Sequence, residues 1–187
     1  MGKICVSSPF SEEAVLELKA GDSLLISGSI LVARDAAHRR LVELLAKGHD
    51  LPVNLTGQTL YYMGPSPARP GAVIGACGPT TSRRMDRYTV PLLEQGLKVM
   101  IGKGERSADI KRGLIKYQSV YLVTLGGAGA LLGECVKKAE TICYADLGAE
   151  AVMRLEVEDF PAFVAYDCRG GDLFEQERTK YHHMCKD

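Results

Sequence analysis

The sequence predicts an α/β domain built on a largely parallel or mixed sheet with flanking helices. Apolar, β-branched segments alternate along the chain with amphipathic segments of helical period, an order typical of α/β folds. Glycine-rich turns follow several of the expected strands, as at residues 102–104 and 126–129. The chain has 187 residues, which suits a single domain over residues 1–187 with a hydrophobic core of ordinary size.

The first part of the chain is expected to form a helix, a long strand and a second helix. Ser11 begins a short amphipathic helix, because the acidic residues that follow it suit a first helical turn. Residues 24–32 are rich in apolar and β-branched side chains and predict a strand that leads to Arg34. Asp35 then caps a helix over residues 36–47, whose apolar stripe has helical spacing.

The middle of the chain combines a loop-rich crossing with a short, buried strand. Residues 49–70 contain four prolines and one short strand candidate at residues 59–63. Residues 72–77 are small and apolar, which predicts a strand covered on both faces. Thr80 and Thr81 follow it as N-cap candidates for the next helix.

The second half of the chain continues the alternation. Ser107 caps one helix, and a second helix starts after the glycines at 126–129 and carries apolar residues as far as Ala139. A polar helix begins at Asp172. The expected strands are residues 97–101, 120–125, 142–144, 151–157 and 163–166, with a break at 159–161.

Three cations follow expected strands or begin expected helices: Arg34, Arg84 and Lys103. Ligands of open α/β sheets bind outside the carboxyl ends of the strands, so these cations predict a site for an anion with more than one charge. Guanidinium groups suit carboxylates, which they bind bidentately. Thr80, Thr81 and Arg84 together describe a small anion site at a helix start. The alternatives are an ordinary capped helix and surface cations with no shared purpose.

Charge and cysteine content exclude several classes of protein. Lys plus Arg and Asp plus Glu both number 23, so no net charge favours nucleic acid or an anionic membrane. No apolar run approaches a membrane span, and the start has no apolar signal segment, so we expect a cytoplasmic protein. The six scattered cysteines indicate reduced thiols. His182, His183 and Cys185 form a short terminal cluster, which is more often solvated than metal-binding, so no metal site is predicted.

The turn Gly127-x-Gly129-x-x-Leu132 partly matches a dinucleotide-binding fingerprint. The third glycine is missing, and Asp146 is the only acidic residue near the required distance. Small residues needed for close helix packing explain the same pattern. A nucleotide-binding α/β module is therefore kept only as an alternative.

Several ordered blocks carry a family resemblance over essentially the whole chain. They are Ser27-Gly28, residues 33–39, Gly64-Pro65, residues 78–86, residues 102–104, residues 126–129 and residues 159–162. On these blocks the chain resembles the β subunit, or C-terminal domain, of class I fumarate hydratases and L-tartrate dehydratases. One departure is Arg83, where the resemblance leads us to expect glycine.

The resemblance implies a swivelling β/β/α domain of an iron–sulfur hydro-lyase. In such an enzyme a 4Fe-4S cluster, bound by the α subunit and not by this chain, acts as a Lewis acid on the substrate hydroxyl. The implied partners are the cluster-bearing α subunit, in a hetero-oligomer, and a small dicarboxylate. Dehydration of malate to fumarate is the first expectation and of tartrate to oxaloacetate the second. The alternative from another class is a non-catalytic interaction or regulatory module that retains the fold.

The resemblance also implies roles for individual residues. Arg34, Arg84 and Lys103 correspond to the clamp on the substrate carboxylates, and Thr80 to the hydroxyl near the carbon that loses its proton. Thr80 and Lys103 are thus the catalytic candidates. The candidates for supporting roles around them are Asp35, His38, Thr81 and Asp86. Asp35 and His38 either orient Arg34 or serve as a cap and a surface histidine, and Asp86 is either a partner of Arg84 or a plain helix charge.

Overall fold

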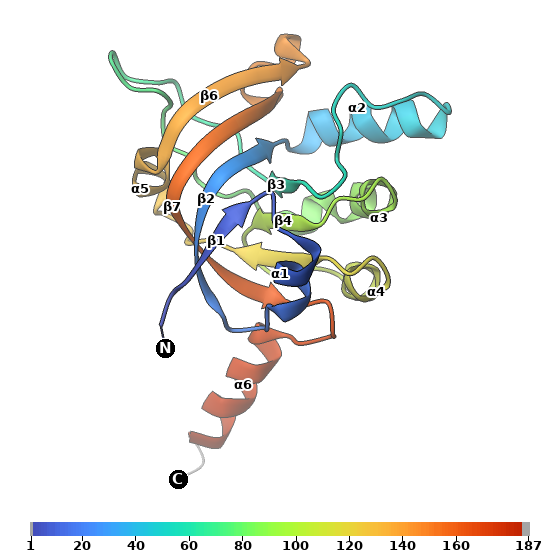
Figure 1. The fold of residues 1–187 in the computed structure, drawn as a ribbon, viewed down its shortest axis with the longest axis vertical. Helices are drawn as coiled ribbons and strands as arrows, with labels where there is room; N and C mark the ends of the chain where they lie inside the picture. The colour runs from blue at the N-terminus through green and yellow to red at the C-terminus, as the bar shows by residue number, and fades with distance from the viewer. Residues whose placement is uncertain (1, 185–187) are drawn as a thin grey trace.

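The computed structural model describes residues 2–184, and the side chains of residues 2–181. Figure 1 shows a sheet whose long strands curve together on one side while α2, α3 and α4 lie on the other. The strands are β1 (Ile4–Ser8), β2 (Ser23–Val32), β3 (Thr59–Tyr61), β4 (Val99–Gly102), β5 (Val120–Val123), β6 (Val136–Cys143) and β7 (Val152–Tyr166). The helices are α1 (Glu12–Glu17), α2 (Asp35–Ala46), α3 (Asp86–Glu94), α4 (Ala108–Lys116), α5 (Gly129–Glu134) and α6 (Leu173–Met184), with 3₁₀ turns η1 (Ser82–Met85) and η2 (Ala145–Glu150).

The sheet is mixed, as the sequence predicts, and has seven strands in the order β1-β2-β3-β4-β5-β7-β6. The strands β1 to β5 are parallel to their neighbours, whereas β7 is antiparallel to β5 and β6. The long strand β7 also pairs antiparallel with β2, from Ser23↔Phe163 to Val32↔Met153. This second pairing closes β2, β3, β4, β5 and β7 into a ring, so the chain forms one closed sheet with β1 and β6 on its outer edges.

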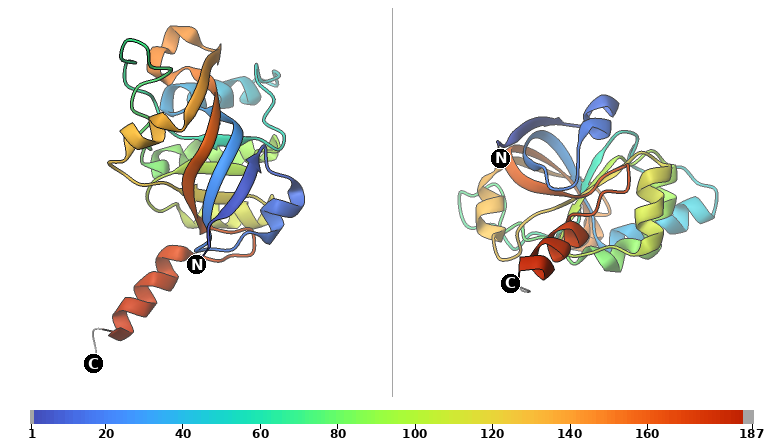
Figure 2. Two further views of the ribbon diagram at one scale, coloured as in Figure 1. Left: turned by 60° about the vertical axis from the view of Figure 1, so that its left-hand side comes forward. Right: turned by 90° about the horizontal axis from the view of Figure 1, so that it is seen from below.

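Two apolar cores lie on opposite faces of the ring. Alternate residues of one strand enter different cores, as a period of two requires: Ile30 and Val32 of β2 belong to one core and Leu31 to the other. The second core lies between the sheet and α2, α3 and α4, which leave their N-termini at the carboxyl end of the parallel strands (Figure 1). In Figure 2, α6 projects away from this body. No helix in the described part is long and apolar enough to cross a membrane.

Residues 72–77 do not form the buried strand that the sequence predicts. They run without a regular partner strand past residue 66, where the Ser66 amide donates to the Ala76 carbonyl at 3.1 Å and the Ala76 amide donates to Ser66 Oγ at 2.8 Å. Gly75 allows this approach, because a Cβ there would lie 2.1 Å from the Ser66 carbonyl oxygen. The small side chains thus serve close packing of a loop, and Val73 stays half exposed.

The predictions for residues 129–166 are wrong in two places. The helix after Gly129 ends at Glu134, and β6 follows where helix was expected to continue to Ala139. The strand β7 runs through the expected break at 159–161. Its register against β2 shifts between Ile26 and Gly28, and Asp159 takes a positive φ of 51°. A β-bulge therefore absorbs the residues that resembled a break.

Two expected caps are also shifted. Arg34 is the N-cap of α2, and Asp35 is its first residue. Thr81 precedes the 3₁₀ turn η1, where Arg84 lies, and α3 begins only at Asp86. Neither Arg34 nor Thr81 makes a side-chain capping hydrogen bond. The predicted terminal cluster cannot be placed, since Cys185 and the side chains of His182 and His183 lie outside the described part.

Candidate functional site

The segment 79–82 extends the sheet beyond the ends of β3 and β4. The Thr80 amide donates to the Tyr62 carbonyl at 2.7 Å, and the Ser82 amide donates to the Lys103 carbonyl at 3.0 Å. The Lys103 amide in turn donates to Ser82 Oγ at 3.1 Å. Backbone hydrogen bonds on both sides therefore fix Thr80 and Lys103 at the same carboxyl edge of the sheet.

Arg34 reaches this edge from the neighbouring strand. The Ala33 amide donates to the Tyr61 carbonyl at 3.2 Å, and the Tyr62 amide donates to the Ile101 carbonyl at 2.8 Å. Arg34 and Lys103 therefore follow strands that are separated only by β3. With neighbouring strands about 4.8 Å apart, their backbones lie roughly 10 Å apart, a separation that long side chains can bridge with a small anion between them.

Arg84 joins the same cluster through Asp35. Its Nε and Nη2 donate to the two carboxylate oxygens of Asp35 at 3.1 and 2.8 Å. Arg84 is 52% exposed, so the pair is half solvated and contributes little to stability. The pair does link η1 to the start of α2, beside Arg34. The predicted cations Arg34, Arg84 and Lys103 and the hydroxyl of Thr80 thus gather at one edge, with Thr81 exposed next to them.

His38 lies beneath this edge and is fully buried, in contrast to the surface histidine that the sequence left open. Its Nδ1 lies 3.0 Å from the Arg34 carbonyl oxygen, which can only accept, so Nδ1 carries the proton. Its ring packs edge-on against Tyr62. Burial lowers the pKa of His38 to about 4. The imidazole is therefore neutral at pH 7 and ties the backbone of Arg34 to the second core.

Asp86 binds a cation other than Arg84. Its Oδ1 accepts from Arg106 Nε at 2.6 Å, and its Oδ2 accepts from the Ser107 amide at 2.7 Å. Arg106 is only 2% exposed and also donates to Thr89 Oγ1 at 2.7 Å. Its guanidinium lies over the rings of Tyr62 and Tyr121. This network joins the start of α3 to the β4–α4 turn.

Sequence reasoning missed Arg106. The residue belongs to a polar run between Gly104 and Ser107 that looks like a solvated turn. Its burial and its contacts with Asp86 and Thr89 distinguish it, and these appear only in the structure. Those contacts occupy its guanidinium inside the protein, so Arg106 is suited to a supporting role.

The glycine-rich turn at 126–129 closes another side of the site. A Cβ at Gly126 would lie 3.9 Å from Lys103 Cδ, and a Cβ at Gly129 would lie 3.0 Å from the Gly78 nitrogen. The Cys77 amide donates to the Gly129 carbonyl at 2.8 Å. The close backbone approach gives Gly129 a packing reason that needs no nucleotide, and Gly127 takes a positive φ of 85° in the turn.

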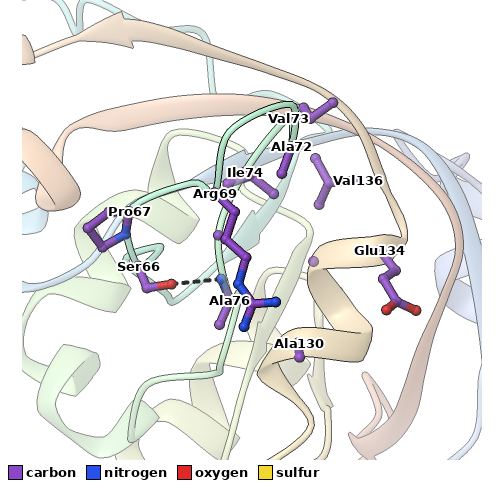
Figure 3. A pocket seen from close by; sticks show the side chains of 12 residues that line it. Ser66, Pro67, Arg69, Ala72, Val73, Ile74, Ala76, Ala130, Glu134 and Val136 are labelled. Atoms are coloured by element: carbon purple, nitrogen blue, oxygen red, sulfur yellow. Dashed lines mark hydrogen bonds between the residues drawn. The ribbon is translucent and has the colours of Figure 1, made fainter.

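A separate hollow of about 410 Å³ lies between the loop 66–76 and α5 (Figure 3). Arg69 points into it from the loop, and Ala130 and Glu134 line it from α5. None of the predicted site residues lines this hollow. The same loop leads through Cys77 to Thr80, so the hollow and the site share one connecting segment.

The described residues include no group of three or more His, Cys, Asp or Glu side chains placed to hold a metal ion. The described cysteines are dispersed: Cys77 and Cys168 are buried, Cys135 and Cys143 are half-buried, and Cys5 is exposed. Burial raises the pKa of the Cys77 thiol to about 11. No three of these described cysteines are grouped in one place.

Comparisons with known proteins show the family to which the chain is similar. Residues 2–177 match the family described as Fumarase C-terminus. Fumarate hydratase 1, mitochondrial, of Leishmania major is 44% identical over 156 residues, which cover 82% of this chain and 28% of that protein. The anaerobic class I fumarate hydratase of Escherichia coli strain K12 is 41% identical over 165 residues, covering 87% of this chain and 30% of that protein.

A relative of similar length is the putative L(+)-tartrate dehydratase subunit beta of Methanocaldococcus jannaschii. It is 33% identical over 178 residues, covering 92% of this chain and 91% of that protein. The chain therefore spans about three tenths of the length of the fumarate hydratases and nearly all of the beta subunit. By the family match and by these relatives, the chain belongs to the Fumarase C-terminus family of class I fumarate hydratases and tartrate dehydratase beta subunits.

Proposed function

We propose that this chain is the β-type part of a hydro-lyase that reversibly dehydrates a hydroxy-dicarboxylate, malate to fumarate first and tartrate to oxaloacetate second. The observation that supports it is the meeting of Arg34, Thr80 and Lys103, with Arg84, at one sheet edge. A scaffold protein has no need for several half-exposed cations around one hydroxyl. The alternative, a non-catalytic interaction module, leaves that arrangement unexplained.

The cations suit a substrate that carries two carboxylates. Arg34 and Arg84 would each bind one carboxylate oxygen pair, because a guanidinium presents parallel N–H donors. Lys103 would act as a compact charge between them. Removal of a proton next to a carboxylate builds enolate-like charge on that group, and fixed cations stabilise this charge more than that of the ground state. The clamp would thus promote the reaction as well as bind the substrate.

Thr80 is the residue proposed to handle the proton. Its backbone is held by Tyr62, its side chain is nearly buried, and no described side chain forms a hydrogen bond with its hydroxyl. A threonine hydroxyl is a poor base when unaided. An acidic residue of the partner would therefore be needed to accept the proton. Asp35 and His38 would support Arg84 and Arg34 respectively, and Asp86 would act only through Arg106.

The proposed 4Fe-4S cluster would belong to the partner, since the described residues of this chain do not fit its ligation. When bound there, the cluster would supply a Lewis acid for the substrate hydroxyl. The residues of this chain would bind the carboxylates, exclude water and hold the Thr80 proton. Thr81, exposed at the same edge, would lie at the boundary with the partner.

A face for this α partner borders the proposed site. Three exposed large apolar side chains, Val73, Leu125 and Leu131, lie on segments that pack together around Gly78 and Gly129. Exposed apolar side chains on neighbouring segments suit a surface that a partner covers. We propose that the cluster-bearing subunit covers this face and the adjoining hollow, and that the domain swivels to close the site.

The test is an anaerobic mixture of this chain with its candidate cluster-bearing subunit. Fumarate formation from L-malate is followed in the mixture and in each component alone, with L-tartrate run in parallel. Turnover only in the mixture supports a split hydro-lyase and names its substrate. A stable complex that converts neither diacid would refute the proposed substrates and favour the regulatory module.

Tartrate is kept as the second candidate for one reason. The chain covers 91% of the relative named as a tartrate dehydratase subunit beta, but only about three tenths of the fumarate hydratases. The name of that relative describes a putative beta subunit of an L(+)-tartrate dehydratase. The ratio of the two rates in the same mixture decides between the substrates.

A further inference from the structure

Glu150, the last residue of η2, reaches the start of α2 from a distant part of the sequence. Its Oε2 accepts from the Ala36 amide at 2.7 Å, and its Oε1 lies 3.5 Å from Arg34 Nη2. One carboxylate thus contacts both the backbone and the side chain at the point where β2 leads into α2. None of the sequence motifs includes this residue.

The contact with Ala36 replaces a missing helix cap. Ala36 is the second residue of α2, whose amide normally bonds to the side chain of the N-cap residue. Here the N-cap is Arg34, whose side chain cannot accept a hydrogen bond and makes no capping contact. The Glu150 carboxylate accepts this bond instead, and its charge suits the positive end of the helix dipole. Glu150 therefore fixes the backbone from which the Arg34 side chain departs.

The Arg34 guanidinium lies in a slot with Gly64 as its other wall. A Cβ at Gly64 would lie 2.6 Å from Arg34 Nε and 2.6 Å from the Ala149 carbonyl oxygen. Glycine is required there, since any side chain would displace either the guanidinium or the η2 backbone. The slot limits where Arg34 can point, and Glu150 pulls it toward one end.

Within the described part of the chain, one ion-pair contact at Nη2 holds the Arg34 guanidinium. Its Nε is buried and has no hydrogen-bond partner within the described part of the chain. Arg40 differs, because its Nη1 and Nη2 both donate to the carboxylate of Asp146, in the same 3₁₀ turn η2, at 2.9 and 2.6 Å. The single 3.5 Å contact of Arg34 is different in kind, because it orients the guanidinium and leaves donors for another anion.

We propose that Glu150 is a positioning residue that orients Arg34, within the Gly64 slot, toward a carboxylate of the substrate. This inference rests on the proposed function for the role of Arg34, but the link between Glu150 and Arg34 can be tested by itself. A small misplacement of a clamp residue can cost up to about 100-fold in rate. The effect of Glu150 on turnover should therefore be much larger than that of a half-exposed ion pair on stability.

The kinetic test compares matched variants in the reconstituted complex. Glu150→Gln keeps an acceptor for the Ala36 amide and removes the charge on Arg34, and we expect kcat/KM to fall roughly 10-fold. Glu150→Ala removes both contacts and should cost more. Asp146→Asn is the control, since it breaks the Arg40 pair on the same connection and should change kcat/KM less than about twofold. Wild-type kcat/KM in folded Glu150→Ala would overturn the proposal.

A double-mutant cycle separates positioning from a general structural effect. In the Arg34→Lys background the guanidinium is already absent, so adding Glu150→Gln should change kcat/KM less than about twofold. If the losses of kcat/KM from the two substitutions instead multiply, Glu150 acts on the fold and not through Arg34, and the proposal fails.

A second measurement does not depend on turnover. In the full chain with ¹⁵N-labelled arginine, the Arg34 Nε–H signal is assigned by its loss in Arg34→Lys. We expect a distinct, slowly exchanging signal in the wild type that moves to the position of solvated arginine in Glu150→Ala. An unchanged signal would refute the link to Glu150. If the wild-type complex converts neither diacid, the proposed function fails and this signal alone decides the role of Glu150.

Discussion

Two kinds of cation lie near the carboxyl edge of this sheet: the buried Arg106, and the more exposed Arg34 and Lys103. They differ in how fully their side chains are paired. Arg106 is almost completely buried, and its guanidinium is occupied by Asp86, Thr89 and two tyrosine rings. Arg34 and Lys103 are more exposed, and Arg34 Nε has no partner in the described part. A fully paired, buried cation stabilises the fold, whereas a positioned cation with spare donors is suited to bind an anion. Arginine thus serves two purposes in this chain, a structural one at Arg106 and a binding one at Arg34.

The largest expected effect is a loss of stability when the buried Arg106 is replaced. Arg106→Met leaves the Asp86 carboxylate without its cation in a largely buried place, and the loss of one partner of such a pair typically costs about 3–5 kcal/mol. Urea unfolding of the full chain measures this loss in the free energy of unfolding. Arg112→Met is the matched control, because Arg112 is 71% exposed in its pair with Asp109, and should change the free energy of unfolding by less than about 1 kcal/mol. Equal losses for both variants would refute the distinction between the two groups.

A second effect tests the neutral histidine beneath Arg34. The pKa of His38 is lowered to about 4 by burial, from an ordinary value of 6.5, so the unfolded chain binds more protons between these pH values. Its contribution to stability is complete above pH 6.5 and is lost as the pH falls toward 4, a change of about 3 kcal/mol. Unfolding measured in steps over this range should show the slope, and His38→Gln should reduce it. If the free energy of unfolding of the wild type did not fall between pH 6.5 and 4, or fell equally in His38→Gln, His38 would not be the buried neutral group.

Replacing the more exposed cations, Arg34 and Lys103, should have the opposite effect, a loss of activity with little loss of stability. Lys103→Ala is expected to lower kcat/KM of the reconstituted complex by about 100-fold, since it removes a fixed charge at the developing anion. Its free energy of unfolding should change by less than about 0.5 kcal/mol, because Lys103 is exposed and its fold contacts use the backbone. Lys138→Ala, an exposed lysine on β6, should leave both quantities unchanged. Normal turnover in folded Lys103→Ala would remove Lys103 from the clamp.

The strands β2 to β5 and the site residues that follow them are the part of the molecule that the sequence could predict. Strands such as β2 have a clear apolar period, and Arg34 and Lys103 stand next to their ends, so topology alone brings these residues together. The prediction failed where side chains are small and packing is backbone to backbone. Residues 72–77 have the composition of a buried strand, but Gly75 brings them against residue 66 without a sheet partner.

The contacts over long sequence separations could not be predicted. Glu150 and Ala36 are 114 residues apart, and Arg106 and Asp86 are 20 apart across two elements. No local period or motif links such pairs, because the first depends on the packing of η2 over α2 and the second on the packing of α3 against α4. Supporting residues are therefore harder to find from sequence than the residues they support.

The smallest expected effect distinguishes Asp35 from Glu150, the two carboxylates that hold the clamp arginines. Asp35 binds Arg84 bidentately in a half-solvated pair, so an anion must compete with it, whereas Glu150 leaves most donors of Arg34 available. Asp35→Asn should release Arg84 without moving its backbone, and we expect kcat/KM to fall only about threefold, mainly through KM. Steady-state kinetics of the complex over a range of malate concentrations measures the split. A loss as large as that of Glu150→Ala would mean that both carboxylates position their arginines equally, although Arg84 is 52% exposed and Arg34 only 28%.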